Sequence, residues 1–472
     1  MTNERQIYLL NPKKFSPETI AVTFAKTSRS PHSFREIADE LTDESSAQFN
    51  EKWVVGYGHS SVAEHAVIHV AIENISRLAV ETIESNRLAS YTEKSTRYQK
   101  WDPEAFFTPI ELNDTSLKAD YLSVCKMLFA TYEKAIEAVH EYVKTEMPQG
   151  EAESKASYER RIRTQYIDVC RYLLPACSLA NVGMTANARV MEHAIQKMLS
   201  ARLDEVREIG DEIKKAAREE IPTLIKYADK MSYLEHTTQE LTRLNSKLPT
   251  RQSGDWCSMV DWDSEGENKI LAAALYRFGG ANFDSCLEYV HSLNDEGRLD
   301  LAQVILGSLG EHEAPIRELE HTSYTFEILM DQGAYFEVKR HRMTTQSPQD
   351  LSANLGYAVP RRITASGFEN AYREAMDSAC NLYKRLASFN PHIASYIVPN
   401  GFNRRVLLTM NLREAFHFCS LRSTPTAHFA VRRVALRVAE EIFKCHPRLS
   451  ASMQLPKNES WQSVTEESFT CV

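Results

Sequence analysis

The sequence predicts an α/β protein in which one domain is present twice. Its 472 residues are about twice the length of many single catalytic domains. Short motifs recur in the same order in the two halves, and stretches with strand-like and helix-like apolar spacing alternate along both. With 43% hydrophobic and 25% charged residues, the composition is that of an ordinary globular protein that can bury sizeable cores.

The elements of the first half follow from local patterns. Residues 5–10 (RQIYLL) favour a short strand, and Ser16-Pro17 is a typical helix start, with Ser as the N-cap. Residues 65–83, rich in Val, Ile and Ala, favour a strand that passes into a helix. Helical spacing is predicted over five further stretches, 17–29, 33–55, 116–146, 152–176 and 187–230.

A polar stretch over 233–268 is the best linker candidate. It predicts a first domain over 1–235, a linker over 236–254 and a second domain over 255–472. In the second domain, helices are predicted over 268–278 and 281–294, and residues 321–339 favour strand broken by Gly333. The last part of the chain is predicted to be mostly helical.

Composition narrows the class of protein. The chain has 55 basic and 64 acidic residues, so its formal net charge of −9 argues against a general nucleic-acid binder. Nine cysteines without a CxxC pair indicate free thiols in a reducing compartment. The N-terminus lacks a secretory pattern and no run of about 20 apolar residues occurs, so we expect no membrane contact and a cytoplasmic protein.

The repeat is visible in paired motifs. Glu64-His65 and Glu320-His321 lie 256 positions apart, each before a β-rich stretch and then an arginine-containing turn. Asn187-x-Arg189-x-x-x-His193 matches Asn411-x-Arg413-x-x-x-His417 at a distance of 224 positions. The order is the same in both halves, so we interpret the chain as a tandem duplication in which the first half carries about 30 extra residues.

Several motifs suit the binding of an anion. Arg340-His341-Arg342 can hold a diphosphate or carboxylate through charge-assisted hydrogen bonds, and the loop containing Ser95 and Arg97 can cradle a phosphate. Arg422 follows Asn411 by 11 positions and so shares its helix face. Taken singly, each is as readily an ordinary surface turn or helix cap. His59, Glu64 and His65 could bind a metal, but no further ligand can be identified, so a core or cofactor-contacting histidine is favoured and no metal site is predicted.

Together these motifs resemble the flavin-dependent thymidylate synthases, with the domain present twice. That family carries Arg-His-Arg, then Ser-x-Arg-Tyr after seven residues, a preceding Gly-His-x-x-x-x-Glu-His and a later helix starting Asn-x-Arg. The first half keeps Gly58-His59, Ser95-x-Arg97-Tyr98 and Asn187-x-Arg189, but has Ser85-Asn86-Arg87 and Met198 at the other sites. The second half keeps Arg340-His341-Arg342 and Arg422, but has Asp350 in place of the serine.

The resemblance implies a mixed sheet flanked by helices in each half, with a helical C-terminal part. It also implies a division of labour, because each half retains residues that the other has lost. Ser95 and Arg422 are assigned to catalysis, Ser95 as a hydrogen-bond donor to phosphate rather than a nucleophile. The substrate-binding residues implied are Glu93, Ser95, Arg97, Arg171, Arg340 and Arg422. The cofactor-binding residues implied are His59, Asn187, Arg189, Arg340, His341, Arg342, Asn411, Arg413 and His417.

The activity implied is methylation of dUMP to dTMP with FAD as cofactor and with NADPH and methylenetetrahydrofolate as co-substrates. One composite site per chain is expected, in a homodimer that imitates the family's tetramer. Two alternatives stay open. One is a flavin enzyme of the same fold that acts on another pyrimidine or uses another one-carbon donor. The other is a nucleotide-binding module without catalysis.

Overall fold

A computed structural model describes residues 8, 10–27, 30–56, 59–97, 100–249 and 254–472. The predicted strand over 5–10 therefore lies mostly outside the described residues, as do Gly58 and Tyr98. The chain divides into two compact units. The first contains residues 1–94, 105–115 and 177–250, and the second contains 95–104, 116–176 and 251–472. Two segments of the sequence's first half thus belong to the second unit.

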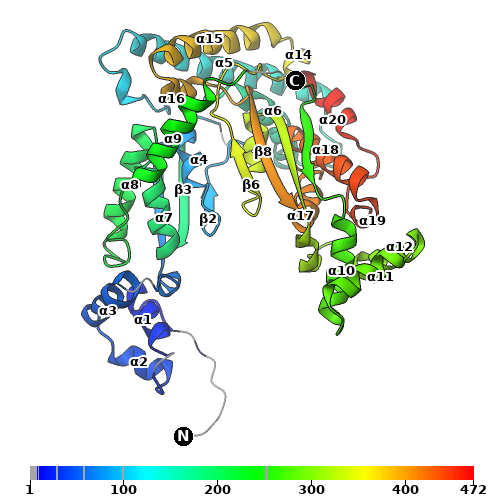
Figure 1. The fold of residues 1–472 in the computed structure, drawn as a ribbon. Helices are drawn as coiled ribbons and strands as arrows, with labels where there is room; N and C mark the ends of the chain where they lie inside the picture. The colour runs from blue at the N-terminus through cyan, green and yellow to red at the C-terminus, as the bar shows by residue number, and fades with distance from the viewer. Residues whose placement is uncertain (1–7, 9, 28–29, 57–58, 98–99, 250–253) are drawn as a thin grey trace. The chain divides into compact units, whose positions relative to one another are not determined.

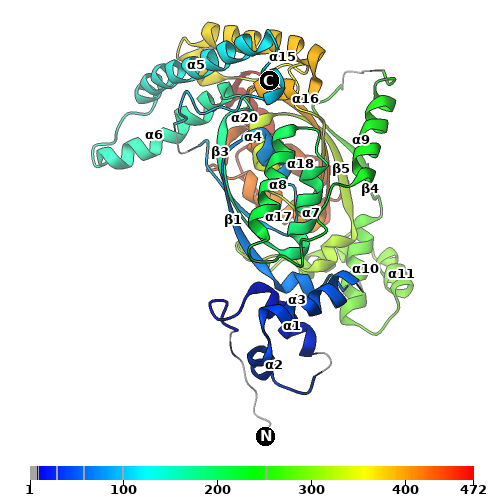
Figure 2. The same cartoon turned by 90° about the vertical axis from the view of Figure 1, so that its left-hand side faces the viewer.

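The first unit is built on a three-stranded antiparallel sheet in the order β1-β3-β2. Its strands are β1 (Val67–Ser76), β2 (Ser90–Glu93) and β3 (Leu179–Asn187). Alternate residues of β3 are buried, and helices α4 (Arg77–Ile83), α7 (Ala188–Leu199) and α8 (Asp204–Ala217) share the core of this unit (Figure 2). Its other helical segments are α1 (Pro17–Thr27), α2 (Phe34–Glu40), α3 (Asp43–Phe49), η1 (Asn50–Gly56), η2 (Val62–His65), η3 (Ile110–Leu112) and α9 (Ser232–Asn245).

The second unit contains a four-stranded antiparallel sheet in the order β4-β5-β8-β6 (Figure 1). Its strands are β4 (Cys257–Trp262), β5 (Ser323–Asp331), β6 (Thr345–Pro348) and β8 (Asn403–Asn411), while β7 (Val359–Pro360) pairs with β9 (Phe469–Cys471). The helices around the four-stranded sheet are α10 (Gly266–Phe278), α11 (Phe283–Ser292), α12 (Asp295–Leu306), η5 (Arg317–His321), α13 (Gln332–Val338), α17 (Leu412–Arg422), α18 (Phe429–Cys445), α19 (Pro447–Ser450) and α20 (Trp461–Ser468).

A helical layer of the second unit combines segments from both halves of the sequence. The first half contributes α5 (Leu117–Glu146), α6 (Lys155–Cys170) and η4 (Arg171–Leu173), and the second contributes α14 (Arg361–Ala365), α15 (Glu369–Phe389), α16 (Pro391–Ala394) and η6 (Ser395–Ile397). α5 packs against α15, and Pro175 bridges to Pro399 in antiparallel fashion. The short backbone bridge holds the ends of η4 and η6 together, immediately before β3 and β8.

The two sheets repeat the same local plan. Val67 pairs with Asn187 in the first, and Ser323 pairs with Asn411 in the second. Each antiparallel pair is followed by a helix whose N-cap is a polar side chain: Asn187 caps α7 through the N–H of Val190, and Asn411 caps α17 through the N–H of Glu414. Strand pairing therefore shows which residue of the second half corresponds to each residue of the first half. The residue numbers of corresponding positions differ by 256 before the bulge in β1, by 255 after it, and by 224 from β3 and β8 onward.

The α+β class is confirmed, with three differences in detail. All described strand pairs of the two main sheets are antiparallel, so these sheets are not mixed. Residues 332–338 form α13 rather than strand, because Asp331 accepts the N–H of Ala334 and starts a helix that is buried on all sides. The linker candidate over 233–268 contains α9, and most of its length beyond residue 256 is β4 and the start of α10.

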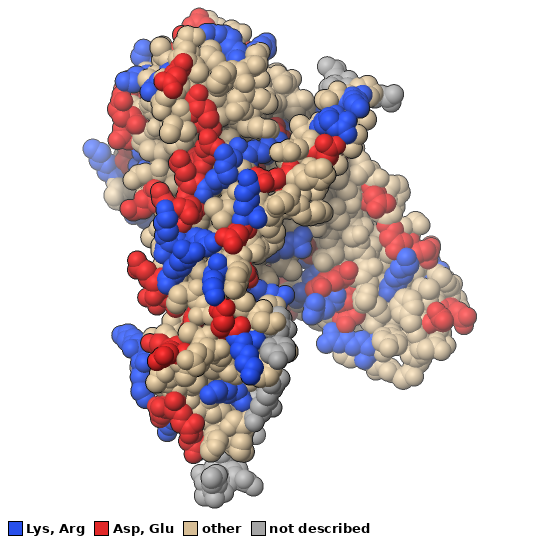
Figure 3. Space-filling model, turned by 60° about the vertical axis from the view of Figure 1, so that its left-hand side comes forward, with Lys and Arg blue, Asp and Glu red and all other residues tan. Residues whose placement is uncertain are grey.

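The surface visible in Figure 3 intermixes Lys and Arg with Asp and Glu over much of its area. The nine cysteines are free thiols, most of them buried. Within the described ranges, no helix is long and apolar enough to cross a bilayer.

Asp331 makes the stability of the second unit depend on pH. Burial raises the pKa of this carboxyl to about 6, although it accepts the Ala334 N–H. The folded state therefore binds its proton more tightly than the unfolded state does, so stability contributed by the protonated form is lost as pH rises from about 4 to 6. We expect the free energy of unfolding of Asp331→Asn to exceed that of the wild type by an amount that grows with pH, up to about 3 kcal/mol at pH 7. Urea unfolding at a series of pH values measures this difference, and parallel curves for the two proteins would contradict it.

Candidate functional site

A loop from the first half of the sequence enters the second unit between residues 95 and 97. Arg97 forms a bidentate ion pair with Asp168 of α6, with Nε–Oδ1 and Nη2–Oδ2 distances of 2.9 and 2.7 Å. Its Nη2 also donates to the carbonyl of Thr426, from the second half of the sequence. The backbone N–H of Arg97 donates to Ser95 Oγ at 3.2 Å. Asp168 thus holds Arg97 in one orientation.

Arg171 lies deeper, with only 2% of its surface exposed. Its Nη1 donates to Thr96 Oγ1 at 3.1 Å and lies 4.0 Å from Glu337 Oε1, and its Nη2 donates to the Gly333 carbonyl. Among the described residues its buried Nε has no hydrogen-bond partner. The buried Nε atoms of Arg432, Arg433 and Arg437 also lack hydrogen-bond partners among the described residues, so this feature does not single out Arg171.

Glu337, in the last turn of α13, is the carboxylate around which the arginines gather. It receives Nη1 of Arg422 at 3.0 Å. Burial alone would raise the pKa of Glu337, but Arg171, Arg340, Arg422 and Arg97 together hold it below its ordinary value. One guanidinium group from each half of the sequence, Arg171 and Arg422, therefore contacts this carboxylate.

His341 links Arg422 to a second carboxylate. Its Nε2 accepts from Arg422 Nε at 2.9 Å, and its Nδ1 lies 2.9 Å from Glu414 Oε1. Burial lowers the pKa of His341, with the neighbouring Arg422 acting in the same direction, and the bond to Glu414 offsets this only in part. His417 lies beside the imidazole, with ring centroids 5.3 Å apart. The imidazole is consequently neutral at physiological pH.

His428 supports the other side of this arginine cluster. It is buried, its Nδ1 accepts the Ala430 N–H that starts α18, and its Nε2 faces the Asp168 carbonyl at 3.3 Å. Burial, followed by the charges of Arg171 and Arg97, keeps the pKa of His428 well below its ordinary value. A neutral His428 adds no further positive charge beside the arginines.

The other predicted site residues of the second unit lie on the same elements. Arg340 is exposed, Arg342 is half-buried and both belong to the turn after α13. Asn411 caps α17. Arg413 donates to Glu320 at 2.9 Å and to the Pro315 carbonyl at 2.8 Å. Arg340 and Arg342 thus lie in the turn after α13, and Arg413 lies in the first turn of α17. The sequence prediction assigns all three to cofactor binding.

The remaining predicted residues belong to the first unit. Glu93 is paired with Arg77 at 2.8 Å, and both side chains are buried. Asn187 caps α7, and Arg189 pairs with Glu64 at 2.5 Å, as Arg413 does with Glu320. His59 is exposed and its ring lies near Trp53. Their roles toward a ligand stay predictions.

The matching positions show that the two halves have lost different parts of the cluster. Where the second half has Glu337, Arg340, His341, Glu414 and Arg422, the first half has Thr82, Ser85, Asn86, Val190 and Met198. Where the first half has Thr96, Arg97, Asp168 and Arg171, the second half has Leu351, Ser352, His392 and Ser395. The hydroxyl of Ser395 donates to the Leu351 carbonyl, in the position of the Arg171–Thr96 contact.

Five residues of the cluster are absent from the sequence prediction: Thr96, Asp168, Glu337, Glu414 and His428. Two of them carried a usable signal. Glu337 precedes Arg340 by three positions, and Asp168 precedes Arg171 by three, a spacing at which side chains at the end of a helix lie near each other. The partners of His341 and His428 come from distant segments and leave no local pattern.

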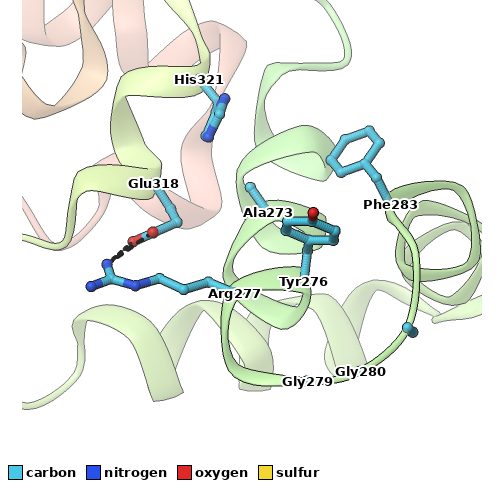
Figure 4. A pocket seen from close by; sticks show the side chains of 9 residues that line it. Ala273, Tyr276, Arg277, Gly279, Gly280, Phe283, Glu318 and His321 are labelled. Atoms are coloured by element: carbon cyan, nitrogen blue, oxygen red, sulfur yellow. Dashed lines mark hydrogen bonds and ion pairs between the residues drawn. The ribbon is translucent and has the colours of Figure 1, made fainter.

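A separate cavity of about 660 Å³ lies between α10 and η5 in the second unit (Figure 4). Arg277 and Glu318 form an ion pair on one side of it, and Tyr276, Phe283 and His321 are among its other lining residues (Figure 4). The arginine cluster described above is made of other residues.

Comparison with known proteins decides the family. The model of a family described as thymidylate synthase complementing protein matches residues 12–223 and again residues 259–448. The chain belongs to this family. The two separate matches fit a tandem form, and the resemblance read from the sequence is confirmed. The chain is accordingly an enzyme of the flavin-dependent thymidylate synthase type.

Individual relatives differ in how much of the chain they span. A UPF0159 protein of Chlamydia muridarum is 30% identical over 86% of this chain and 80% of its own length. A flavin-dependent thymidylate synthase of Clostridium tetani is 27% identical over 45% of this chain and 82% of its own length. The solved structure of the flavin-dependent thymidylate synthase ThyX from Helicobacter pylori, complexed with FAD and dUMP, covers 46% of this chain and 96% of its own at 19% identity and a TM-score of 0.30.

The residues in and near the turn 340–342 have the hydrogen-bonding groups and charges that a flavin dinucleotide needs. A diphosphate needs cationic and N–H donors, which Arg340, Arg342 and Arg413 supply. Arg340 is exposed, and Arg413 keeps about a third of its side chain exposed despite its pair with Glu320. This donor set can therefore receive an anionic group from solution.

Proposed function

We propose that the second unit carries one composite nucleotide site at which dUMP is methylated to dTMP with FAD as cofactor. One observation supports this above all: Arg171 from the first half lies 4.0 Å from the Glu337 carboxylate, and Arg422 from the second half donates to the same carboxylate at 3.0 Å. A nucleotide monophosphate is a dianion, and paired guanidinium groups are its usual protein partners. NADPH as reductant, methylenetetrahydrofolate as donor and a cytoplasmic homodimer belong to the same proposal.

The residues have distinct roles in this proposal. Ser95, Arg97 and Arg171 hold the phosphate, with Arg171 Nε as the donor that still lacks an acceptor among the described residues. Arg422 stabilises negative charge that develops on the pyrimidine. Arg340, Arg342, Asn411 and Arg413 hold the flavin. The Ser95 hydroxyl accepts the backbone N–H of Arg97, and among the described residues no basic side chain forms a hydrogen bond with it. Without a base to activate it, Ser95 binds the phosphate rather than acting as a nucleophile.

FAD would supply the redox chemistry, and the residues of this chain would bind and orient the reactants. The low exposure of Glu337 and Arg171 keeps water from the inner end of the arginine cluster. In such surroundings the guanidinium groups act on an anion more strongly than they would in water.

The test is product analysis with the purified full chain. We expect a yellow protein that forms dTMP from dUMP when methylenetetrahydrofolate and NADPH are present, and no dTMP when either is left out. Methylation of another pyrimidine instead would favour the altered-substrate alternative. A colourless protein that binds dUMP but cannot be reconstituted with FAD would favour the non-catalytic module.

A further inference from the structure

The hydrogen bonds of His341 determine its tautomer. Arg422 Nε carries a hydrogen and has no lone pair to offer, so His341 Nε2 at 2.9 Å must be the acceptor. The Glu414 carboxylate accepts only, so Nδ1 at 2.9 Å must carry the hydrogen. The imidazole is buried, with 4% of its surface exposed. Both ring nitrogens are thus occupied by protein partners, and neither is left to bind a ligand.

This chain of bonds fixes Arg422 from two directions. Nε is held by His341, and Nη1 is held by Glu337 at 3.0 Å. Among the described residues, Nη2 has no hydrogen-bond partner, and the side chain keeps 15% of its surface exposed. A planar guanidinium with two of its nitrogens fixed presents the third in a set direction.

The same residues are missing together from the other half. At the positions that match His341, Glu414 and Arg422, the first half has Asn86, Val190 and Met198. Asn86 donates to the carbonyl of Ile83, the last residue of the preceding helix α4, instead. The helix cap is retained, because Asn187 caps α7 as Asn411 caps α17. The fold at this place therefore does not need the three residues, and their common absence indicates that they work as a unit.

We propose that Glu414 and His341 are positioning residues that orient Arg422 toward the nucleotide. Glu414 holds His341 in the Nδ1–H tautomer, and the free Nε2 lone pair of His341 holds Arg422. This inference rests on the proposed function in taking dUMP as the ligand of Arg422. It also changes the role of His341, which the sequence assigns to the cofactor.

The decisive experiment is a double-mutant cycle on dUMP binding, measured by calorimetry with the full chain. Glu414→Val installs the residue of the first half. We expect it to raise the Kd for dUMP about 10-fold when Arg422 is present and less than 2-fold in an Arg422→Ala background, because the effect passes through Arg422. Glu414→Gln is expected to stay within about 3-fold of the wild type, because its amide oxygen still accepts the Nδ1 hydrogen.

Equal effects of Glu414→Val in both backgrounds would overturn the proposal. Glu374→Val, at an exposed position of α15, serves as the control and should leave the Kd unchanged. A wild-type protein that does not bind dUMP would refute the proposed function rather than the positioning. For that case, or if Glu414→Val fails to fold, nitrogen-15 NMR of labelled histidine in the wild type decides. A neutral Nδ1–H signal for His341 is expected, and an Nε2–H signal contradicts the proposal.

Discussion

Replacing Arg422 by methionine is expected to lower kcat/KM for dTMP formation about 10³-fold, since one preorganised donor to developing negative charge accounts for about that factor in other enzymes. Methionine is the residue at the matching position of the first half, Met198, so the change copies one half into the other. Arg422 loses its bonds to His341 and Glu337 in this variant. Steady-state kinetics with dUMP measures the effect.

Arg385→Met is the matched control for Arg422→Met. Arg385 also lies in the second unit, but its ion pair with Asp120 is largely exposed. Exposed pairs contribute about 0–1 kcal/mol, so this variant should keep its activity and stability. If Arg422→Met retained activity within a few-fold of the control, Arg422 would not be the residue that acts on the pyrimidine.

Glu337→Ala is expected to destabilise the second unit by about 3–5 kcal/mol, because it removes the carboxylate from a largely buried group of like charges. Arg171 would lose its nearest carboxylate while remaining 2% exposed, and Arg422 would lose an ion pair. Such a loss corresponds to a fall in Tm of roughly 10 °C for a domain of this size. Differential scanning calorimetry measures it, and added dUMP should recover part of the loss by mass action.

Glu337→Gln separates charge from shape in the same experiment. Its amide oxygen still accepts from Arg422, so we expect a smaller loss than in the alanine variant. A Tm for Glu337→Ala that stays within about 2 °C of the wild type, roughly 1 kcal/mol or less, would show that the arginines do not depend on this carboxylate.

Sequence patterns located the cationic part of the candidate site but not its acidic part. Arg97, Arg171, Arg340 and Arg422 stand in motifs of fixed spacing and were therefore predictable. Glu337, Asp168 and Glu414 belong to helices whose charges resemble an ordinary solvated face. Their partners come from other segments, and only the fold brings them together.

The fold was predictable where periodicity was strong and uncertain where burial was complete. The apolar pattern of residues 65–83 predicts a strand followed by a helix, and these are β1 and α4. The corresponding α13 contains Gly333, Tyr335 and Phe336 and is buried on all sides, so its composition favours strand. Asp331 decides for helix by capping it, a contact that depends on its neighbours. β3 and β8 were not predicted, although Pro399-Asn400-Gly401 just before β8 is a typical turn signal.

Duplication gives a physical reason for this arrangement. After a duplication, the two copies of the domain can change independently. If one site takes residues from both copies, each copy can lose the residues that the other copy supplies to that site. Pro175 and Pro399 join the two halves by an antiparallel bridge within the second unit. Each proline follows the matching residue, Arg171 or Ser395, by four positions. One of these positions kept a guanidinium and the other a hydroxyl.

The number of nucleotides bound per chain tests the composite site most directly. Calorimetric titration of the purified full chain with dUMP should saturate at one nucleotide per chain. Arg97, Arg171, Arg340 and Arg422 form one site, whereas the corresponding residues of the opposite halves, which would form a second site, are Ser352, Ser395, Ser85 and Met198. Saturation at two equal sites per chain would contradict the account.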